Sequence, residues 1–324
     1  MTVEAADQPV ATRSARDDEV TTWHGDGWVL LQGLVGTNEI DAAAADLVEL
    51  FPTAEAFHAD PDGETERWLG RPAPSHDPFV WSPTGPGFRP EQHRWSSEFP
   101  FPGSGALSRL CVHPSIVDFA ERALRSADLR LYQAQVAAKY QGITNYEQPM
   151  HTDRNHSWLP PAIDPQWWHL ETFLYLCDVD EGSAPTHLVP VPDARGRDTT
   201  APLYMPNQDP ELYAAERPAP GVRGSLLAYR PDVFHRGVEM TTPGATRFLL
   251  NLSFKRANQD WIGFHAPHAR ANSPHSVTFI EGSTPRELAL LGFPEPGHPI
   301  WTDEMLALTA ARYPGLDLTP WSAR

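Results

Sequence analysis

The residues best suited to chemistry are a histidine and an aspartate with one residue between them, in His151-Thr152-Asp153. In an extended segment, residues i and i+2 project to the same face, so this imidazole and this carboxylate can bind one metal ion together. A third ligand has to come from elsewhere in the chain. The best candidate is His235, because it follows the apolar run Ser225–Tyr229 and so stands just beyond a predicted strand.

Two histidines and one carboxylate on one face of an octahedral metal leave three coordination positions open, as in the facial triad of non-haem Fe(II) oxygenases. The alternative is an ordinary solvated or capping pair, since a chain with 14 histidines and 42 acidic residues contains H-x-D pairs by chance. His156 lacks a carboxylate partner at this spacing and is not predicted to be a ligand. We interpret His187, His265 and His268 as ordinary loop or core histidines.

An arginine twelve residues after His235 supports the metal hypothesis, because it opens the alternating run Arg247–Phe254. In an exposed amphipathic strand, the polar face of this run would meet water. In a barrel, the same face would line a cavity while the apolar face packs under helices. The planar fork of Arg247 would then suit one carboxylate of a dicarboxylate cosubstrate.

The elements that must position these residues are strands in the middle of the chain and helices near both ends. Alternation and turn signals predict four central strands, at Leu129–Lys139, Glu171–Leu176, Ser225–Tyr229 and Arg247–Phe254. Residues 52–103 are rich in Pro, Gly, Trp and His without a sustained period, which predicts long loops. We expect a flexible polar tail over residues 1–18. We then expect one α+β, mainly β domain over residues 19–324, a β-sandwich or barrel with a C-terminal helical extension.

The composition excludes several classes of partner. Acidic residues outnumber basic ones by 42 to 25, and the net charge of −17 disfavours nucleic acid and anionic membrane surfaces. The start of the chain lacks the order of a signal peptide, and no apolar run is long enough for a transmembrane helix. Two cysteines, Cys111 and Cys177, cannot build a disulfide framework, which favours the cytoplasm.

The order His151-x-Asp153, His235, Arg247 resembles the phytanoyl-CoA dioxygenase-like (PhyH) family of Fe(II)/2-oxoglutarate-dependent oxygenases. Several flanking segments agree with this resemblance in type and order: Asp26–Gly33 before a helix, Lys139–Gly142 before the metal motif, Leu176–Pro190, and Phe234–Gly237 around the distal histidine. The resemblance spans roughly residues 20–255.

This resemblance implies a double-stranded β-helix, a jelly-roll or cupin-like barrel with flanking helices. It implies that His151, Asp153 and His235 bind Fe(II). It further implies that 2-oxoglutarate chelates the iron while Arg247 pairs with the far carboxylate. O₂ would be the second cosubstrate, and succinate and CO₂ would be released.

The resemblance also suggests secondary roles. Gln135 and Phe173 match positions that face the cosubstrate in relatives. Asp153 stands where halogenating relatives carry a small residue, so hydroxylation or desaturation is favoured. Gly237 stands where some relatives carry a serine, so one hydrogen bond to the cosubstrate has to come from elsewhere or is absent.

The substrate is expected to be a small molecule. Asn155 and Trp158 are the candidate substrate contacts, because they leave the metal motif in a segment rich in Pro and Trp that resembles a wall or lid. An acyl-CoA is disfavoured, since no basic cluster for its phosphates is apparent. Two alternatives stay open: a cupin-like metalloenzyme that does not use 2-oxoglutarate, and a non-catalytic binding protein on the same fold.

Overall fold

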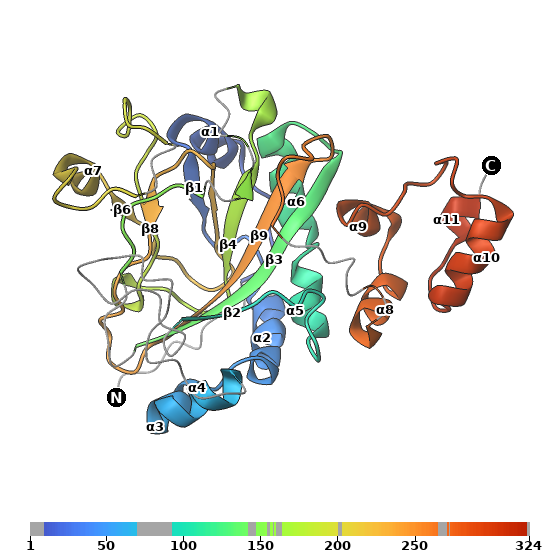
Figure 1. Cartoon of the computed structure of the whole chain (residues 1–324), viewed down its shortest axis with the longest axis horizontal. Helices are drawn as coiled ribbons and strands as arrows, with labels where there is room; N and C mark the ends of the chain where they lie inside the picture. The colour runs from blue at the N-terminus through green and yellow to red at the C-terminus, as the bar shows by residue number, and fades with distance from the viewer. Residues whose placement is uncertain are drawn as a thin grey trace.

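A six-stranded antiparallel sheet forms the centre of the protein (Figure 1). The computed structural model describes residues 10–69, 93–141, 147–153, 156–157, 159, 164–199, 203–264, 271 and 273–322. Across the large sheet the strand order is β1 (Trp28–Leu31), β7 (Leu226–Tyr229), β4 (Leu170–Tyr175), β9 (Thr246–Arg256), β3 (Leu129–Tyr140) and β2 (His93–Ser96). A second, three-stranded sheet has the order β6 (Arg217–Pro218), β5 (His187–Leu188) and β8 (His235–Arg236). The four central strands predicted from the sequence are therefore confirmed, with ends that differ by one or two residues.

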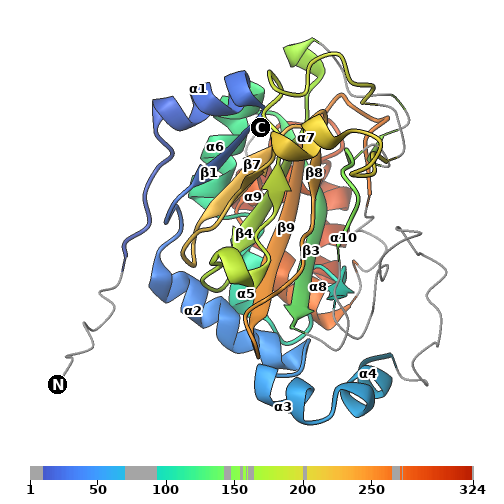
Figure 2. The ribbon, with the colours of Figure 1, turned by 90° about the vertical axis from the view of Figure 1, so that its left-hand side faces the viewer.

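Helices cover one face of the large sheet, and the small sheet lies on its other side (Figures 1 and 2). Those before the central strands are α1 (Asp17–Asp26), α2 (Thr37–Ala45), α3 (Ala54–Ala59), α4 (Pro61–Leu69), α5 (Gly105–Leu110) and α6 (Pro114–Leu124). Of the later helices, α7 (Pro210–Ala214) lies on the side of the small sheet (Figure 1). The others are α8 (Pro274–Glu281), α9 (Pro285–Leu290), α10 (Asp303–Arg312) and α11 (Thr319–Ser322). None of the described helices is long and apolar enough to span a membrane.

The strand β9 confirms the two-faced pattern expected from its sequence. Leu250, Leu252 and Phe254 belong to the apolar core between the large sheet and its helices, and Phe248 packs against that core. The opposite face carries Arg247, and with it Leu249, Asn251 and Ser253, which face away from the helices. The polar face of β9 is buried, since each of these four side chains is at most 6% exposed. An exposed amphipathic strand is thereby excluded.

A β-bulge in β3 changes which residues face the helices. Leu131 pairs with Phe254 and Gln133 with Ser253, so Tyr132 has no partner of its own in β9. One extra residue in a strand moves every later side chain to the other face. Before the bulge, the odd-numbered Leu129 and Leu131 face the helices. After the bulge, the residues that face the helices are the even-numbered Ala134, Val136, Ala138 and Tyr140. Tyr132 and Gln133 are thus both left on the side away from the helices.

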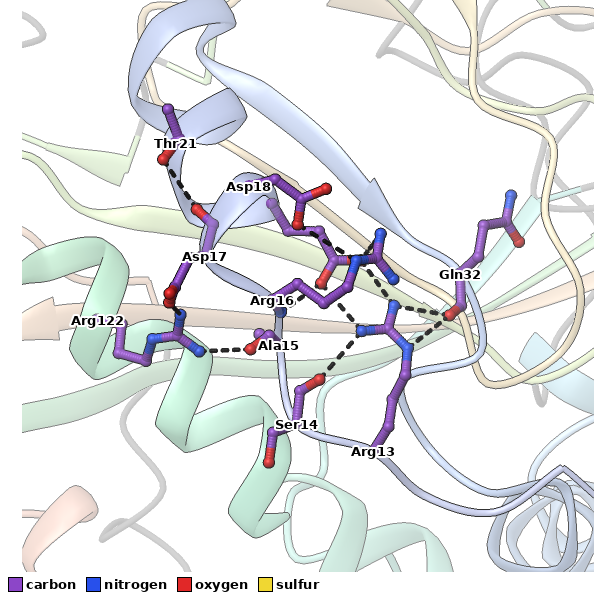
Figure 3. A network of polar contacts seen from close by, with 10 residues as sticks. Arg13, Ser14, Ala15, Arg16, Asp17, Asp18, Thr21, Gln32 and Arg122 are labelled. Atoms are coloured by element: carbon purple, nitrogen blue, oxygen red, sulfur yellow. Dashed lines mark hydrogen bonds and ion pairs between the residues drawn. The ribbon is translucent and has the colours of Figure 1, made fainter.

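The segment before α1 packs against the body of the protein (Figure 3). The Arg13 guanidinium pairs with Glu19 at 2.7 Å and also donates to the main-chain oxygen of Gln32. Arg122 on α6 donates to the Ala15 oxygen at 2.5 Å and to Asp17 at 2.6 Å. For residues 10–18 the expected flexible tail is wrong. The acidic residues Asp17–Glu19 form the first turn of α1, and Arg13 and Arg122 bind their carboxylates.

The expectation of long loops over residues 52–103 is wrong for its first third. Residues 54–69 form α3 and α4. The side chain of Thr53 caps α3 by accepting a hydrogen bond from the Ala56 amide at 3.2 Å, and Phe57 is buried in the core. Each helix is too short for a clear apolar period, so the sequence pattern did not indicate them. Residues 70–92 lie outside the described part of the chain.

Candidate metal centre and cavity

The two predicted histidine ligands are brought together by a β-bridge. The His151 amide donates to the His235 oxygen at 3.0 Å, and the His235 amide donates to the His151 oxygen at 2.8 Å. Their ring centroids lie 4.5 Å apart. His235 begins β8, so the small sheet positions one ligand and holds the segment that carries the other two.

Main-chain carbonyls orient both rings in the same way. Nδ1 of His151 lies 2.8 Å from the Pro149 oxygen, and Nδ1 of His235 lies 3.1 Å from the Val233 oxygen. Because a carbonyl only accepts, each Nδ1 must be the donor. Nε2 of each ring then carries the lone pair that a metal ion needs, which is the usual arrangement of ligating histidines.

Asp153 completes the group. Its carboxylate lies 3.5 Å from Nε2 of His235 and accepts a hydrogen bond of 2.6 Å from the Tyr229 hydroxyl on β7. Ligand atoms of His151, Asp153 and His235 all lie within 4.8 Å of one another, so the three residues could hold one metal ion. Tyr229 was not anticipated from the sequence, where it is only the last residue of an apolar run.

The charges of the metal-free group are set by burial and by one ion pair. Burial lowers the pKa of His151 to about 4, so this ring is neutral. Burial opposes the charged forms of both Asp153 and His235, but their mutual attraction outweighs it. The pKa of Asp153 is therefore held well below its usual value and that of His235 is raised. A metal ion binds the neutral form of His235, so protonation of this ring competes with metal binding.

A cavity of ≈ 310 Å³ opens beside the candidate ligands. It is lined by Trp95, Gln133, Gln135, Gln148, His151, Asp153, His156, Phe173, Thr186, Tyr229, His235, Gly237, Arg247, Leu249, Asn251 and Phe264. Arg247, Gln135 and Phe173, the predicted cosubstrate contacts, are all in this lining. Gln135 and Phe173 both stand opposite Asn251, one on each neighbouring strand of β9.

One end of the inward face carries two buried basic side chains. Arg247 on β9 pairs in register with Lys139 on β3, and both side chains are at most 5% exposed. Arg247 donates to the Ala184 oxygen, and Lys139 donates to the Val238 oxygen. Burial, aided by the Arg247 charge, lowers the pKa of Lys139 well below its usual value. This end of the cavity therefore favours an anion.

A buried polar network surrounds Glu171 on β4, and the sequence analysis missed it. Glu171 is fully buried, and its carboxylate accepts hydrogen bonds from the hydroxyls of Tyr132 and Ser253. It also lies 3.0 Å from Nδ1 of His156 and 3.6 Å from Nε2 of His169. An acidic residue inside an otherwise apolar strand was the one available signal, because buried carboxylates are almost always paired.

Asp153, His156 and Glu171 form a second group whose ligand atoms lie within 4.8 Å of one another. Both carboxylate oxygens of Glu171 already accept hydrogen bonds from protein donors. We therefore interpret Asp153, His156 and Glu171 as part of a hydrogen-bonded network beside the candidate metal centre. His187 lies 3.1 Å from Glu216 and is not among the described residues that line the cavity.

The remaining predicted contacts do not all fall on described residues. Asn155 and Trp158, the candidate substrate contacts, lie outside the described part of the chain, as do His265 and His268. At Gly237, the amide donates to the Gln148 side chain at 2.8 Å, and both residues line the cavity. The side chain of Gln148 thus occupies the neighbourhood where some relatives carry a serine.

No family model and no curated protein match this chain. Solved structures do. The non-heme alpha-ketoglutarate-dependent carbocyclase SnoK from nogalamycin biosynthesis has a TM-score of 0.57 at 16% identity, covering 82% of this chain and 95% of its own. The epimerase SnoN of the same biosynthesis, also described as non-heme and alpha-ketoglutarate dependent, has 0.52 at 18%, covering 74% and 83%.

EctD from S. alaskensis has a TM-score of 0.50 at 15% identity, covering 80% of this chain and 84% of its own. At these identities the likeness is one of fold. The chain therefore shares the architecture of structures that include non-heme alpha-ketoglutarate-dependent enzymes.

Proposed function

We propose that this protein is an Fe(II)- and 2-oxoglutarate-dependent oxygenase that acts on a small molecule. The observation that carries the proposal is one cavity lined both by the His151, Asp153 and His235 group and by the Arg247 guanidinium. A metal with open positions next to a buried cation matches a cosubstrate that chelates at one end and is an anion at the other.

The fold supports the same proposal. The large and small antiparallel sheets, with the candidate ligands between them and helices on the outer face, are consistent with a double-stranded β-helix. We propose this architecture, in a single domain over residues 19–324 of a cytoplasmic protein. SnoK and SnoN belong by their descriptions to the biosynthesis of a small molecule, which agrees with a small-molecule substrate.

The residues that line the cavity fit both Fe(II) and 2-oxoglutarate. His151 and His235 would each offer Nε2 to Fe(II), and Asp153 would offer a carboxylate oxygen. When bound, Fe(II), 2-oxoglutarate and O₂ supply an oxidising chemistry that releases succinate and CO₂ and that we expect to hydroxylate the substrate.

The chain's own contribution is to hold, orient and enclose. Tyr229 holds the Asp153 carboxylate, and the Pro149 and Val233 carbonyls hold the two rings. Arg247 would bind the far carboxylate of 2-oxoglutarate, and Lys139 pairs with Arg247 in register on β3. Asn251 offers a buried side-chain oxygen that has no hydrogen-bond partner among the described residues, so a ligand donor can meet it.

The test is an anaerobic titration of the protein with Fe(II) and 2-oxoglutarate, followed by visible absorption. We expect a charge-transfer band in the wild type, its loss in His151→Ala and Asp153→Ala, and its retention in His298→Ala, an exposed control. Succinate release under O₂ should follow the same pattern.

The outcomes separate the alternatives. Metal binding without any effect of 2-oxoglutarate would favour a cupin-like enzyme of another kind. A band without succinate release for any substrate would favour a binding protein. Normal succinate formation in the Asp153→Ala variant would refute the metal assignment.

A further inference from the structure

The Glu171 network places one imidazole, that of His156, on the wall of the candidate cavity. His156 is 6% exposed, and its ring lines the cavity together with Phe264 and Gln133. Its Nδ1 is bound to Glu171, which is itself fully buried. Burying a carboxylate is costly unless it is well bonded, and here three protein donors bond it. The network therefore holds the His156 ring rigidly.

Nδ1 of His156 must be a donor, because the ionised carboxylate of Glu171 only accepts. The other nitrogen, Nε2, has no hydrogen-bond partner among the described residues. Depending on its protonation, Nε2 either accepts or donates one hydrogen bond. A hydroxyl group can do both, so a hydroxyl is the partner that suits this nitrogen in either state.

Aromatic side chains also lie near His156. Its ring centroid lies 4.5 Å from that of Phe264, and Trp95 and Phe173 also line the cavity. At the same time, His156 is close to the candidate metal ligands, since it shares a group with Asp153 whose ligand atoms lie within 4.8 Å. A ligand oxygen held by His156 would therefore lie in the same cavity as the candidate metal ligands, with the Phe264 ring beside it.

We propose that His156, held by Glu171, binds a hydroxyl group of a ring-bearing substrate and so determines which carbon faces the metal. This proposal rests on the proposed function, because it takes the cavity to be the substrate site. His156 is then a specificity-determining residue, and Glu171 is the positioning residue that acts through it.

The test compares two probes of nearly equal shape, 2-naphthol and 2-methylnaphthalene, which differ by a hydroxyl in place of a methyl group. Binding is measured by tryptophan fluorescence in the metal-free protein and again in the anaerobic Fe(II)–2-oxoglutarate complex. We expect wild type to prefer 2-naphthol roughly tenfold in both forms, the worth of one hydrogen bond. A preference seen only with iron would mean direct ligation of the metal and would overturn the proposal.

Three variants locate the effect. His156→Phe and His156→Leu remove both ring nitrogens. In either variant 2-naphthol and 2-methylnaphthalene should bind about equally. Tyr132→Phe is the control, because it removes another donor to the same Glu171 oxygen from a residue outside the cavity lining. It should keep the preference, and an equal loss there would overturn the role of His156.

The two proposals fail separately. If the wild type forms no charge-transfer band with Fe(II) and 2-oxoglutarate, the proposed function fails whatever the probes do. If the band forms and remains in His156→Leu while the probes bind equally to wild type, only the role of His156 is wrong.

Discussion

The ion pair between His156 and Glu171 should make the stability of the protein depend on pH in a definite direction. Burial lowers the pKa of His156, but the Glu171 carboxylate outweighs burial and raises it to about 9. The unfolded chain should show the ordinary value of 6.5. A folded-state pKa above the unfolded value means that the stabilisation is complete below pH 6.5 and is lost as the pH rises through 9.

The magnitude follows from the two pKa values. A difference of 2.5 between 9 and 6.5 corresponds to about 3.4 kcal/mol, of which about 2.5 kcal/mol should disappear between pH 6.5 and pH 9. The groups that act on His156 are Glu171 and Asp153, which favour the charged ring. His169, packed on the same carboxylate, has its pKa lowered by burial to about 4 and is neutral over this range.

The assay is urea unfolding of the metal-free wild type and of His156→Phe at several values between pH 6 and pH 9. The difference in free energy of unfolding between the two isolates His156 from the other titrating groups. We expect this difference to shrink by about 2.5 kcal/mol as the pH rises. His298→Phe, at an exposed position, should show a constant difference.

A difference between wild type and His156→Phe that stays constant over this range would refute the ion pair. A difference that grows with pH would mean that burial outweighs Glu171 and that the ring is neutral in the folded protein.

Three further predictions concern the site and the core. Arg247→Ala should weaken 2-oxoglutarate binding by about 1.5–3 kcal/mol, the worth of a charge-assisted bond, and an unchanged dissociation constant in the anaerobic titration would remove Arg247 from the site. Tyr229→Phe should weaken Fe(II) binding roughly 10–100-fold by releasing Asp153, as measured by competition with a chelator. Leu250→Ala should cost about 2–5 kcal/mol in urea unfolding without altering the charge-transfer band, since Leu250 is fully buried on the helix side of β9.

Much of the architecture could be predicted because it depends on local patterns. The alternation in Arg247–Phe254 placed the apolar face under the helices and the polar face towards a cavity, and β9 has this arrangement. Thr284 and Glu287 form a capping box at the start of α9, which is likewise a local sequence signal. The short helices α3 and α4 escaped prediction, because six to nine residues are too few to display a period.

The candidate ligands were predictable for a similar reason. His151 and Asp153 are two residues apart, so their common face follows from backbone geometry alone. The grouping of His235 with them was a hypothesis that only the fold could test, and a β-bridge brings it about. The contact residues Asn155 and Trp158 stay predictions.

The sequence by itself therefore determined the order of the chemical groups and the faces of the strands that carry them. The tertiary structure decided what surrounds those groups. The bulge at Tyr132 turns its hydroxyl towards Glu171, 39 residues away, and Tyr229 reaches Asp153 across 76 residues. Such contacts depend on strand register and on chain segments far apart in sequence, and no local periodicity records them.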